Sequence, residues 1–150
     1  ETAPSRRRFD PTVVSDRRFA GLQVLICESN DADRFILEDA LRFEGADVVS
    51  LGNGRDLHAI LSQDRKRFDL AFIDMEFPGY GEGNGVELIR QAMPRMPLIG
   101  LIHRAQSPAW PQWQAAGIAQ VLPRPVDTEL LVTLVRRQLS RSTGDSLRRV

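Results

Sequence analysis

The sequence has little of what marks secreted, membrane-spanning or nucleic-acid-binding proteins. Its single cysteine, Cys27, excludes an internal disulfide and fits a reducing compartment. No apolar run approaches the roughly 18 residues that span a bilayer, and the N-terminus has no apolar core of an export signal. Twenty basic and twenty acidic residues leave no net charge to indicate nucleic-acid binding. We therefore expect a cytoplasmic protein without a membrane or nucleic-acid partner.

The two ends of the chain differ in composition from the middle. Residues 1–20 combine prolines and arginines with little apolar periodicity, which predicts a linker or flexible arm. Residues 140–150 are polar and rich in arginine, and we expect a solvated tail there. The predicted domain covers residues 21–139. The chain begins with Glu rather than Met, so we interpret it as a piece of a longer protein.

Short apolar runs alternate with stretches of helical periodicity through the predicted domain. Buried strands are expected at 22–27, 46–51, 70–73, 97–102 and 118–122. Helices are expected at 31–44, 54–64, 86–93, briefly within 107–117, and at 127–139. This alternation predicts an α/β fold with a doubly wound, flavodoxin-like (βα)5 parallel sheet in strand order 2-1-3-4-5.

Carboxylates follow two strands that this order makes neighbours. Asp74 ends the third apolar run and Glu28 ends the first. Function in open α/β sheets gathers at the carboxyl ends of the strands, so Glu28 and Asp74 are expected side by side at a functional edge. An Asp at a strand tip can also serve only to cap the next helix, and this stretch alone leaves both interpretations open.

The ordered motifs of residues 21–139 resemble the receiver domain of two-component signalling, especially receivers attached to hybrid histidine kinases. The resemblance depends on the whole set, because no single motif is decisive. The matching segments are Gly21–Asn30, Asn53-Gly54, Phe68-Asp69, Asp74–Pro78, Asn84-Gly85, Ala116-Gly117 and Arg124-Pro125.

This resemblance implies a role for each matched position. Asp74 takes the place of the phosphorylated aspartate, so the domain would be a phosphoprotein if its site works. Glu28 and Asp74 would bind Mg²⁺ through their carboxylates, and Glu76 would complete the metal sphere through its backbone carbonyl. The peptide bond before Pro125 is expected to be cis, as is common in the family.

Three supporting positions depart from the family pattern. Ser29 cannot supply the charge of the second acidic residue, and Ile102 has no hydroxyl for a phosphoryl group. Arg124 replaces a lysine, and its planar fork could instead grip Asp74 or Glu28 and hold the site in one state. We therefore expect a degenerate pseudo-receiver with weak or absent Mg²⁺ binding.

Two further features bear on ligands and partners. Gly85 lies seven residues after Pro78, so the loop after the third strand is longer than is usual in the family. Its sequence GYGEGNG matches neither the P-loop nor the G-x-G-x-x-G pattern of phosphate-binding loops. We therefore expect a flexible loop, with a phosphate cradle as the alternative.

Trp110 and Trp113 lie three residues apart on the short fourth helix, where they could form a partner hot spot or pack into the core.

Three functions follow as hypotheses. The favoured one is a non-catalytic regulatory domain that contacts histidine kinases or other signalling proteins, or forms a homodimer through the fourth helix, fifth strand and fifth helix. The alternatives are a working receiver phosphorylated on Asp74 and a small-ligand sensor using the enlarged loop. An enzyme is not expected, because no Ser-His-Asp order, metal-ligand spacing or dinucleotide fingerprint occurs.

Overall fold

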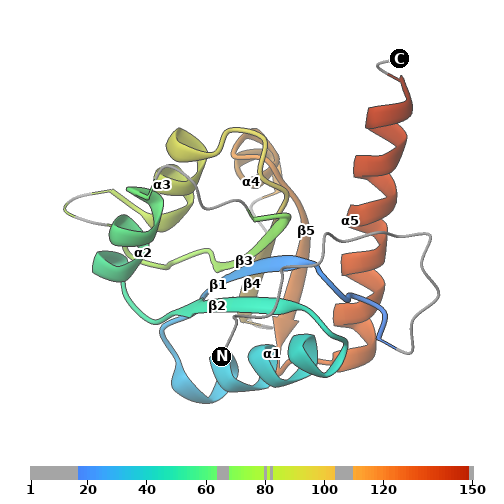
Figure 1. Ribbon diagram of the computed structural model, residues 1–150. Helices are drawn as coiled ribbons and strands as arrows, with labels where there is room; N and C mark the ends of the chain where they lie inside the picture. The colour runs from blue at the N-terminus through green and yellow to red at the C-terminus, as the bar shows by residue number, and fades with distance from the viewer. Residues whose placement is uncertain (1–16, 64–67, 80, 82, 104–109, 149–150) are drawn as a thin grey trace, which may run out of the picture.

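A five-stranded parallel sheet lies between two layers of helices in the computed structural model (Figure 1). The structure describes residues 17–63, 68–79, 81, 83–103 and 110–148. The strands are β1 (Gln23–Cys27), β2 (Asp47–Leu51), β3 (Leu70–Asp74), β4 (Leu98–His103) and β5 (Ile118–Arg124). The helices are α1 (Asp31–Phe43), α2 (Gly54–Leu61), α3 (Gly85–Ala92), α4 (Trp110–Ala115) and α5 (Thr128–Arg148).

The strand order is β2-β1-β3-β4-β5, with every neighbouring pair parallel. The predicted flavodoxin-like fold and strand order are therefore confirmed. The central strand, β3, has β1 on one side and β4 on the other. Because parallel strands end at a common edge, the last residues of β1, β3 and β5 point toward one rim of the sheet.

Side chains of β3 alternate between two separate cores. Leu70 and Phe72 pack in a cluster with α1 and α5, whereas Ala71 and Ile73 pack in a cluster with α2 and α3. Figure 1 shows the same division, with α1 and α5 on one side of the sheet and the other helices opposite. Burial on both faces explains why the strand is continuously apolar rather than alternating in polarity.

Three of the helices that follow the strands have an asparagine as their N-terminal cap. Asn30 accepts a hydrogen bond from Asp33 N (2.9 Å), and Asn53 and Asn84 cap α2 and α3 in the same way. Such caps pair backbone N–H groups that have no partner within the helix. They fix each helix start beside the carboxyl edge of the sheet.

Element ends differ from the expectations mainly near the two chain ends. The helix α5 does not end near Leu139 but continues to Arg148, so most of the expected polar tail is helical; no proline interrupts it. At the other end, Phe19 is buried in the core and donates its N–H to Glu44 O (2.7 Å). Packing thus begins within the segment expected to be an arm, whose residues 1–16 lie outside the described part.

Although α5 has 21 residues, it is too polar to cross a membrane. No other helix in the described ranges is long and apolar enough to do so.

Candidate functional site

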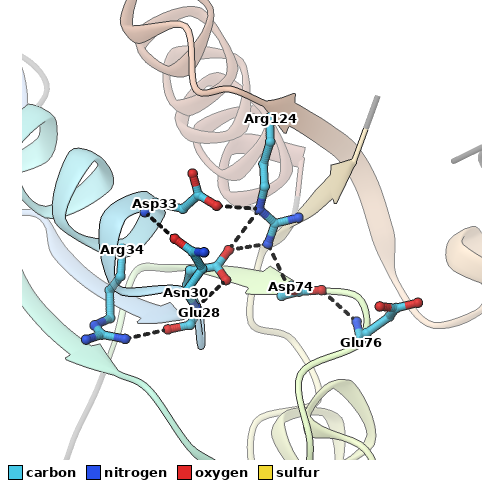
Figure 2. Close-up of polar contacts among 7 residues, drawn as sticks. All are labelled: Glu28, Asn30, Asp33, Arg34, Asp74, Glu76 and Arg124. Carbon is cyan, nitrogen blue, oxygen red and sulfur yellow. Dashed lines mark hydrogen bonds and ion pairs between the residues drawn. The ribbon is translucent and has the colours of Figure 1, made fainter. Parts of the chain in front are cut away.

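The two predicted carboxylates lie side by side at the carboxyl edge of the sheet. Asp74 is the last residue of β3, and Glu28 directly follows β1. The register of β1 and β3 brings the two acids together, because the residues directly before them, Cys27 and Ile73, are paired across these strands. The juxtaposition expected from the strand order is therefore present (Figure 2).

Arg124 bridges these two carboxylates. It is the last residue of β5, and its guanidinium reaches back across the rim (Figure 2). Its Nη2 donates to Asp74 Oδ2 (2.8 Å) and to Glu28 Oε2, and its Nε also donates to Glu28 Oε2 (3.1 Å). The grip that we hypothesised for Arg124 is therefore present, and it involves both acids.

The ion pairs of this site are shielded from water. Glu28 is 1% exposed and Arg124 is 7% exposed. Burial alone lowers the pKa of the Arg124 guanidinium, but the hydrogen bond and charge of Glu28, then the charges of Asp74 and Asp33, raise that pKa to a net value above its usual range. The guanidinium therefore stays charged wherever the domain is folded. Removing one member of such a buried pair is costly, because the other charge is left without compensation.

Backbone amides occupy the remaining carboxylate oxygens. Asn30 N donates to Glu28 Oε1 (3.0 Å), within the turn that leads into α1. Glu76 N donates to Asp74 Oδ1 (2.8 Å), which folds the chain back directly after β3. All four oxygens of Glu28 and Asp74 thus have a protein donor.

The remaining predicted positions are Ser29, Ile102 and Glu76. Ser29 is exposed. Ile102 is buried and sits one residue beyond Leu101, the partner of Asp74 in the β3–β4 register. The side chain of Glu76 points away from the guanidinium in Figure 2. The neighbourhood of Asp74 on β4 is therefore apolar, as the substitution at 102 implies.

A third carboxylate, that of Asp33, belongs to the site and was not predicted. Its Oδ2 lies 3.3 Å from Arg124 Nε, and its N–H is capped by Asn30. The available signal was positional: an acid in the first turn of a helix that begins at a strand tip faces the same edge as the tip. The site therefore places three carboxylates around one guanidinium.

The arrangement does not fit Mg²⁺ while Arg124 is in place. Glu28 and Asp74 are the carboxylates that would hold such an ion, and one oxygen of each already binds Arg124 Nη2. Mg²⁺ requires near-octahedral oxygen ligands at about 2.0–2.1 Å. In the described ranges, no three Asp, Glu, His or Cys side chains are grouped so that they could hold a metal ion.

The enlarged loop after β3 is closed at its base. Pro78 and Asn84 form an antiparallel bridge, and Gly79 N donates to Gly83 O (2.9 Å). Gly79 must be glycine, because a Cβ there would lie 2.5 Å from Gly83 O. Gly85 N is likewise bonded, to Phe77 O (2.8 Å). These amides face loop carbonyls, an arrangement that does not favour the phosphate-cradle alternative.

Of the two predicted interface tryptophans, only Trp113 has a described side chain. Trp113 is half-buried and packs against the core under α2 and α3. The side chain of Trp110 lies outside the described residues. The interface that we expected from these two residues stays a prediction, with the core alternative favoured for Trp113.

A different apolar surface is present on α1. Phe35 is 66% exposed and Phe43 is 80% exposed, and the smaller Ile36 lies beside them. These residues line a groove of about 440 Å³ between α1 and the start of α5. The sequence signal was the spacing of eight between the two phenylalanines, which puts them on one helix face, away from buried Leu37 and Leu41. We call this surface, with its acidic rim residues Asp39 and Glu129, the α1 face.

Comparisons of sequence place this site in a known family. A profile of the response regulator receiver domain matches residues 24–136. The sensor protein TorS of Escherichia coli is 28% identical over 141 residues, covering 92% of this chain and 15% of TorS. The transcriptional regulator NtrC of Salmonella typhimurium is 27% identical over 117 residues, covering 78% of this chain and 24% of NtrC. The chain therefore spans a small part of each of these relatives.

Solved structures show the same fold. The receiver domain of the sensor histidine kinase PA1611 from Pseudomonas aeruginosa superimposes with a TM-score of 0.67 at 24% identity, covering 81% of this chain and 99% of that one. That structure has a magnesium ion coordinated in its active-site cleft. The chemotaxis response regulator CheY4 of Vibrio cholerae gives a TM-score of 0.65 at 22% identity, covering 78% of this chain and 98% of that one.

Proposed function

The chain belongs to the response regulator receiver domain family, and we propose that it is a non-catalytic regulatory domain of two-component signalling, degenerate at its phosphorylation site. It acts through contacts with histidine kinases or other signalling proteins in the cytoplasm. The observation that supports degeneracy is the guanidinium of Arg124 held between Glu28 and Asp74.

The charges around Asp74 support the proposal that it is a poor phosphoacceptor. A phosphoryl group on Asp74 adds negative charge where Glu28 and Asp33 already share the cation Arg124. Phosphoryl transfer needs cations that neutralise the developing charge. Ser29 is not a negatively charged ligand for a metal ion, and Ile102 offers no hydroxyl to the phosphoryl group. The site therefore lacks groups that would compensate the added negative charge.

The test is the mass of the intact domain after incubation with Mg²⁺ and acetyl phosphate. We expect no stoichiometric phosphoryl adduct on the wild-type domain, and the same null result with Asp74→Asn. A working receiver domain treated in parallel shows that the reagent is active. A stoichiometric adduct on the wild type that Asp74→Asn abolishes would overturn the degenerate assignment.

A working phosphoacceptor is the second candidate, and one observation favours it. Arg124 Nη1 is buried and has no hydrogen-bond partner among the described residues, so it could donate to a phosphoryl oxygen on Asp74. Asp74 keeps 16% of its side chain exposed, which gives a phosphodonor some access. The mass measurement separates the two candidates directly.

The α1 face is the surface that we assign to partner contact. Its apolar centre, Phe35 and Phe43, has an acidic rim of Asp39 and Glu129, whereas Arg18 in the groove wall is paired with Glu44. This pattern complements a partner helix with an apolar stripe flanked by Lys or Arg. A symmetric pairing of two copies would bring the acidic rims together, so a basic partner is favoured over a second copy at this face.

The homodimer expected through α4, β5 and α5 is a separate proposal. Light scattering after gel filtration at several protein concentrations tests it. A dimer that persists in Phe43→Ser but is lost on substitution of exposed α5 residues would support the α4–β5–α5 face, and a monomer at all concentrations would remove it.

A further inference from the structure

The groove of the α1 face lies next to the point where the N-terminal segment joins the domain. Arg18 lines the groove, and its backbone N–H donates to Glu44 Oε2 (3.4 Å) while its guanidinium pairs with the same oxygen. The next residue, Phe19, is buried in the core and donates its N–H to Glu44 O (2.7 Å). Residues 1–16, which lie outside the described part, are therefore attached at the Phe43 end of this groove.

The groove combines an apolar centre with acids that have no cation beside them. Phe35 and Phe43 are largely exposed, and a contiguous apolar patch of this kind marks a surface that binds another polypeptide segment. Asp39 and Glu129 are exposed at the rim, and neither forms an ion pair within the described ranges. The groove is thus complementary to a segment that carries both apolar and basic side chains.

The segment before Arg17 has this composition. Its sequence, ETAPSRRRFDPTVVSD, has three consecutive arginines, Arg6–Arg8, followed directly by Phe9. From Arg18 back to Phe9 the chain can span up to about 30 Å. Phe35 and Phe43 are eight residues apart on α1, which corresponds to about 12 Å along the helix axis. The segment is therefore long enough to bring Phe9 to any part of the groove.

We propose that the N-terminal arm, residues 6–14 of this same chain, occupies the groove of the α1 face. Phe9 packs against Phe35 and Phe43, and the three arginines lie at the acidic rim. Because arm and groove belong to one chain, the arm is present at an effective concentration on the order of 1 mM, so that even weak contacts keep it bound.

The arm thereby competes with the basic partner helix that we assign to this face. This regulatory role rests on the proposed function, because it requires a partner at the α1 face. The contact between the arm and α1 does not depend on that assignment, so the two are tested by different measurements.

Paramagnetic broadening of amide signals in the whole chain tests the contact. A nitroxide on Ser5→Cys labels the arm, and Cys27 stays unlabelled because its side chain is fully buried. We expect broadened signals for Phe35 and Ile36, which lie toward the end of the groove away from Phe43. The signal of Ile89 should be unchanged, since α3 lies on the opposite side of the sheet (Figure 1).

Charge reversal in the arm should remove the broadening. Arg6→Glu, Arg7→Glu and Arg8→Glu together should restore the Phe35 signal. The control, Arg55→Glu with Arg95→Glu, reverses exposed charges away from the groove and should leave the broadening in place. No broadening in the wild-type arm, or broadening that survives the arm reversal, would overturn the proposal. Broadening of unlabelled chains mixed with labelled ones would also overturn it, because the arm of a second copy would then fill the groove.

Titration with a labelled, lysine-flanked helical peptide tests the competition. Phe9→Ser leaves the charge unchanged and should bind the peptide about threefold or more tightly than the wild type, because the arm no longer occupies the groove. Thr12→Ser, in the same arm, is the matched control and should bind like the wild type. Equal affinities of wild type and Phe9→Ser would overturn the competition. A peptide that binds neither protein would remove the partner assignment, while the broadening still decides whether the arm contacts α1.

Discussion

Arg124 Nη2 lies 2.8 Å from Asp74 Oδ2, although the two residues are 50 positions apart in the chain. The same nitrogen binds Glu28, which is 96 positions from Arg124. One side chain therefore ties the tips of β1, β3 and β5 together. If the proposed function holds, stability and signalling chemistry depend on the same three residues, so substitutions here should change both.

Replacing Arg124 with alanine should destabilise the domain strongly. It leaves Glu28 buried and without its charged partner, and breaking a buried ion pair in this way costs about 3–5 kcal/mol. The free energy of unfolding in urea measures the effect. Arg42→Ala is the matched control, because its pair with Glu38 is exposed and worth about 0.3–0.5 kcal/mol. Equal losses in both variants would contradict a structural role for the buried cluster.

The sequence was sufficient to predict the strand order and the meeting of Glu28, Asp74 and Arg124. Apolar runs mark the buried strands, and a parallel sheet brings their tips together. The sequence was not sufficient to predict that Asp33 belongs to the site, because an acid in the first turn of a helix is commonly interpreted only as a partner of the helix dipole. The sequence also did not predict the length of α5, because the residues after Leu139 are polar, include Gly144 and have no apolar periodicity.

Restoring three family residues should restore phosphorylation. Ser29→Asp adds a carboxylate for Mg²⁺, Ile102→Thr adds a hydroxyl beside Asp74, and Arg124→Lys replaces the guanidinium with a compact charge. We expect the triple variant to gain one phosphoryl mass with acetyl phosphate and Mg²⁺. Adding Asp74→Asn should remove the gain. A folded triple variant that stays unmodified would show that other features, such as the enlarged loop, block the site.

Gly54 should be sensitive to substitution by alanine, since α2 begins against the loop after β3. A Cβ at Gly54 would lie 2.4 Å from Gly79 O and 2.6 Å from Pro78 O, so the backbone of that loop would have to move. We expect Gly54→Ala to lose about 1–3 kcal/mol of unfolding free energy, as overpacking usually costs. Gly83→Ala is the control, because its nearest atom is a flexible Glu87 oxygen at 3.7 Å. Greater damage from the control would refute this contact.

The stability of the domain should fall at alkaline pH because of Cys27. Burial raises the pKa of the Cys27 thiol in the folded state well above its usual range. Above about pH 8.5, the unfolded chain releases this proton while the folded domain retains it, so unfolding is favoured by up to about 1.4 kcal/mol per pH unit. The thiol's contribution is intact below pH 8.5 and is lost as the pH rises.

Urea unfolding of the wild type and Cys27→Ala between pH 7 and 10 measures this contribution. The difference in unfolding free energy between the wild type and Cys27→Ala should become smaller above pH 8.5, because the alanine variant lacks the titrating group. A thiol reagent at pH 8 should modify Cys27 only as fast as the domain opens, because the side chain is fully buried. Rapid modification of the native domain, or a pH-independent difference, would contradict the prediction.

Substitutions on the α1 face should separate partner binding from stability. Phe43 is largely exposed, so Phe43→Ser should change the unfolding free energy by no more than about 0.5 kcal/mol. Leu41→Ala, two residues earlier but fully buried, should cost about 2–5 kcal/mol.

Titration with a labelled amphipathic helix bearing a leucine stripe flanked by lysines should show binding to the wild type that Phe43→Ser weakens. Acidic flanks in place of the lysines should also weaken it, because Asp39 and Glu129 form the rim. Equal binding of both peptides to both proteins would show that the exposed phenylalanines do not form a specific contact surface.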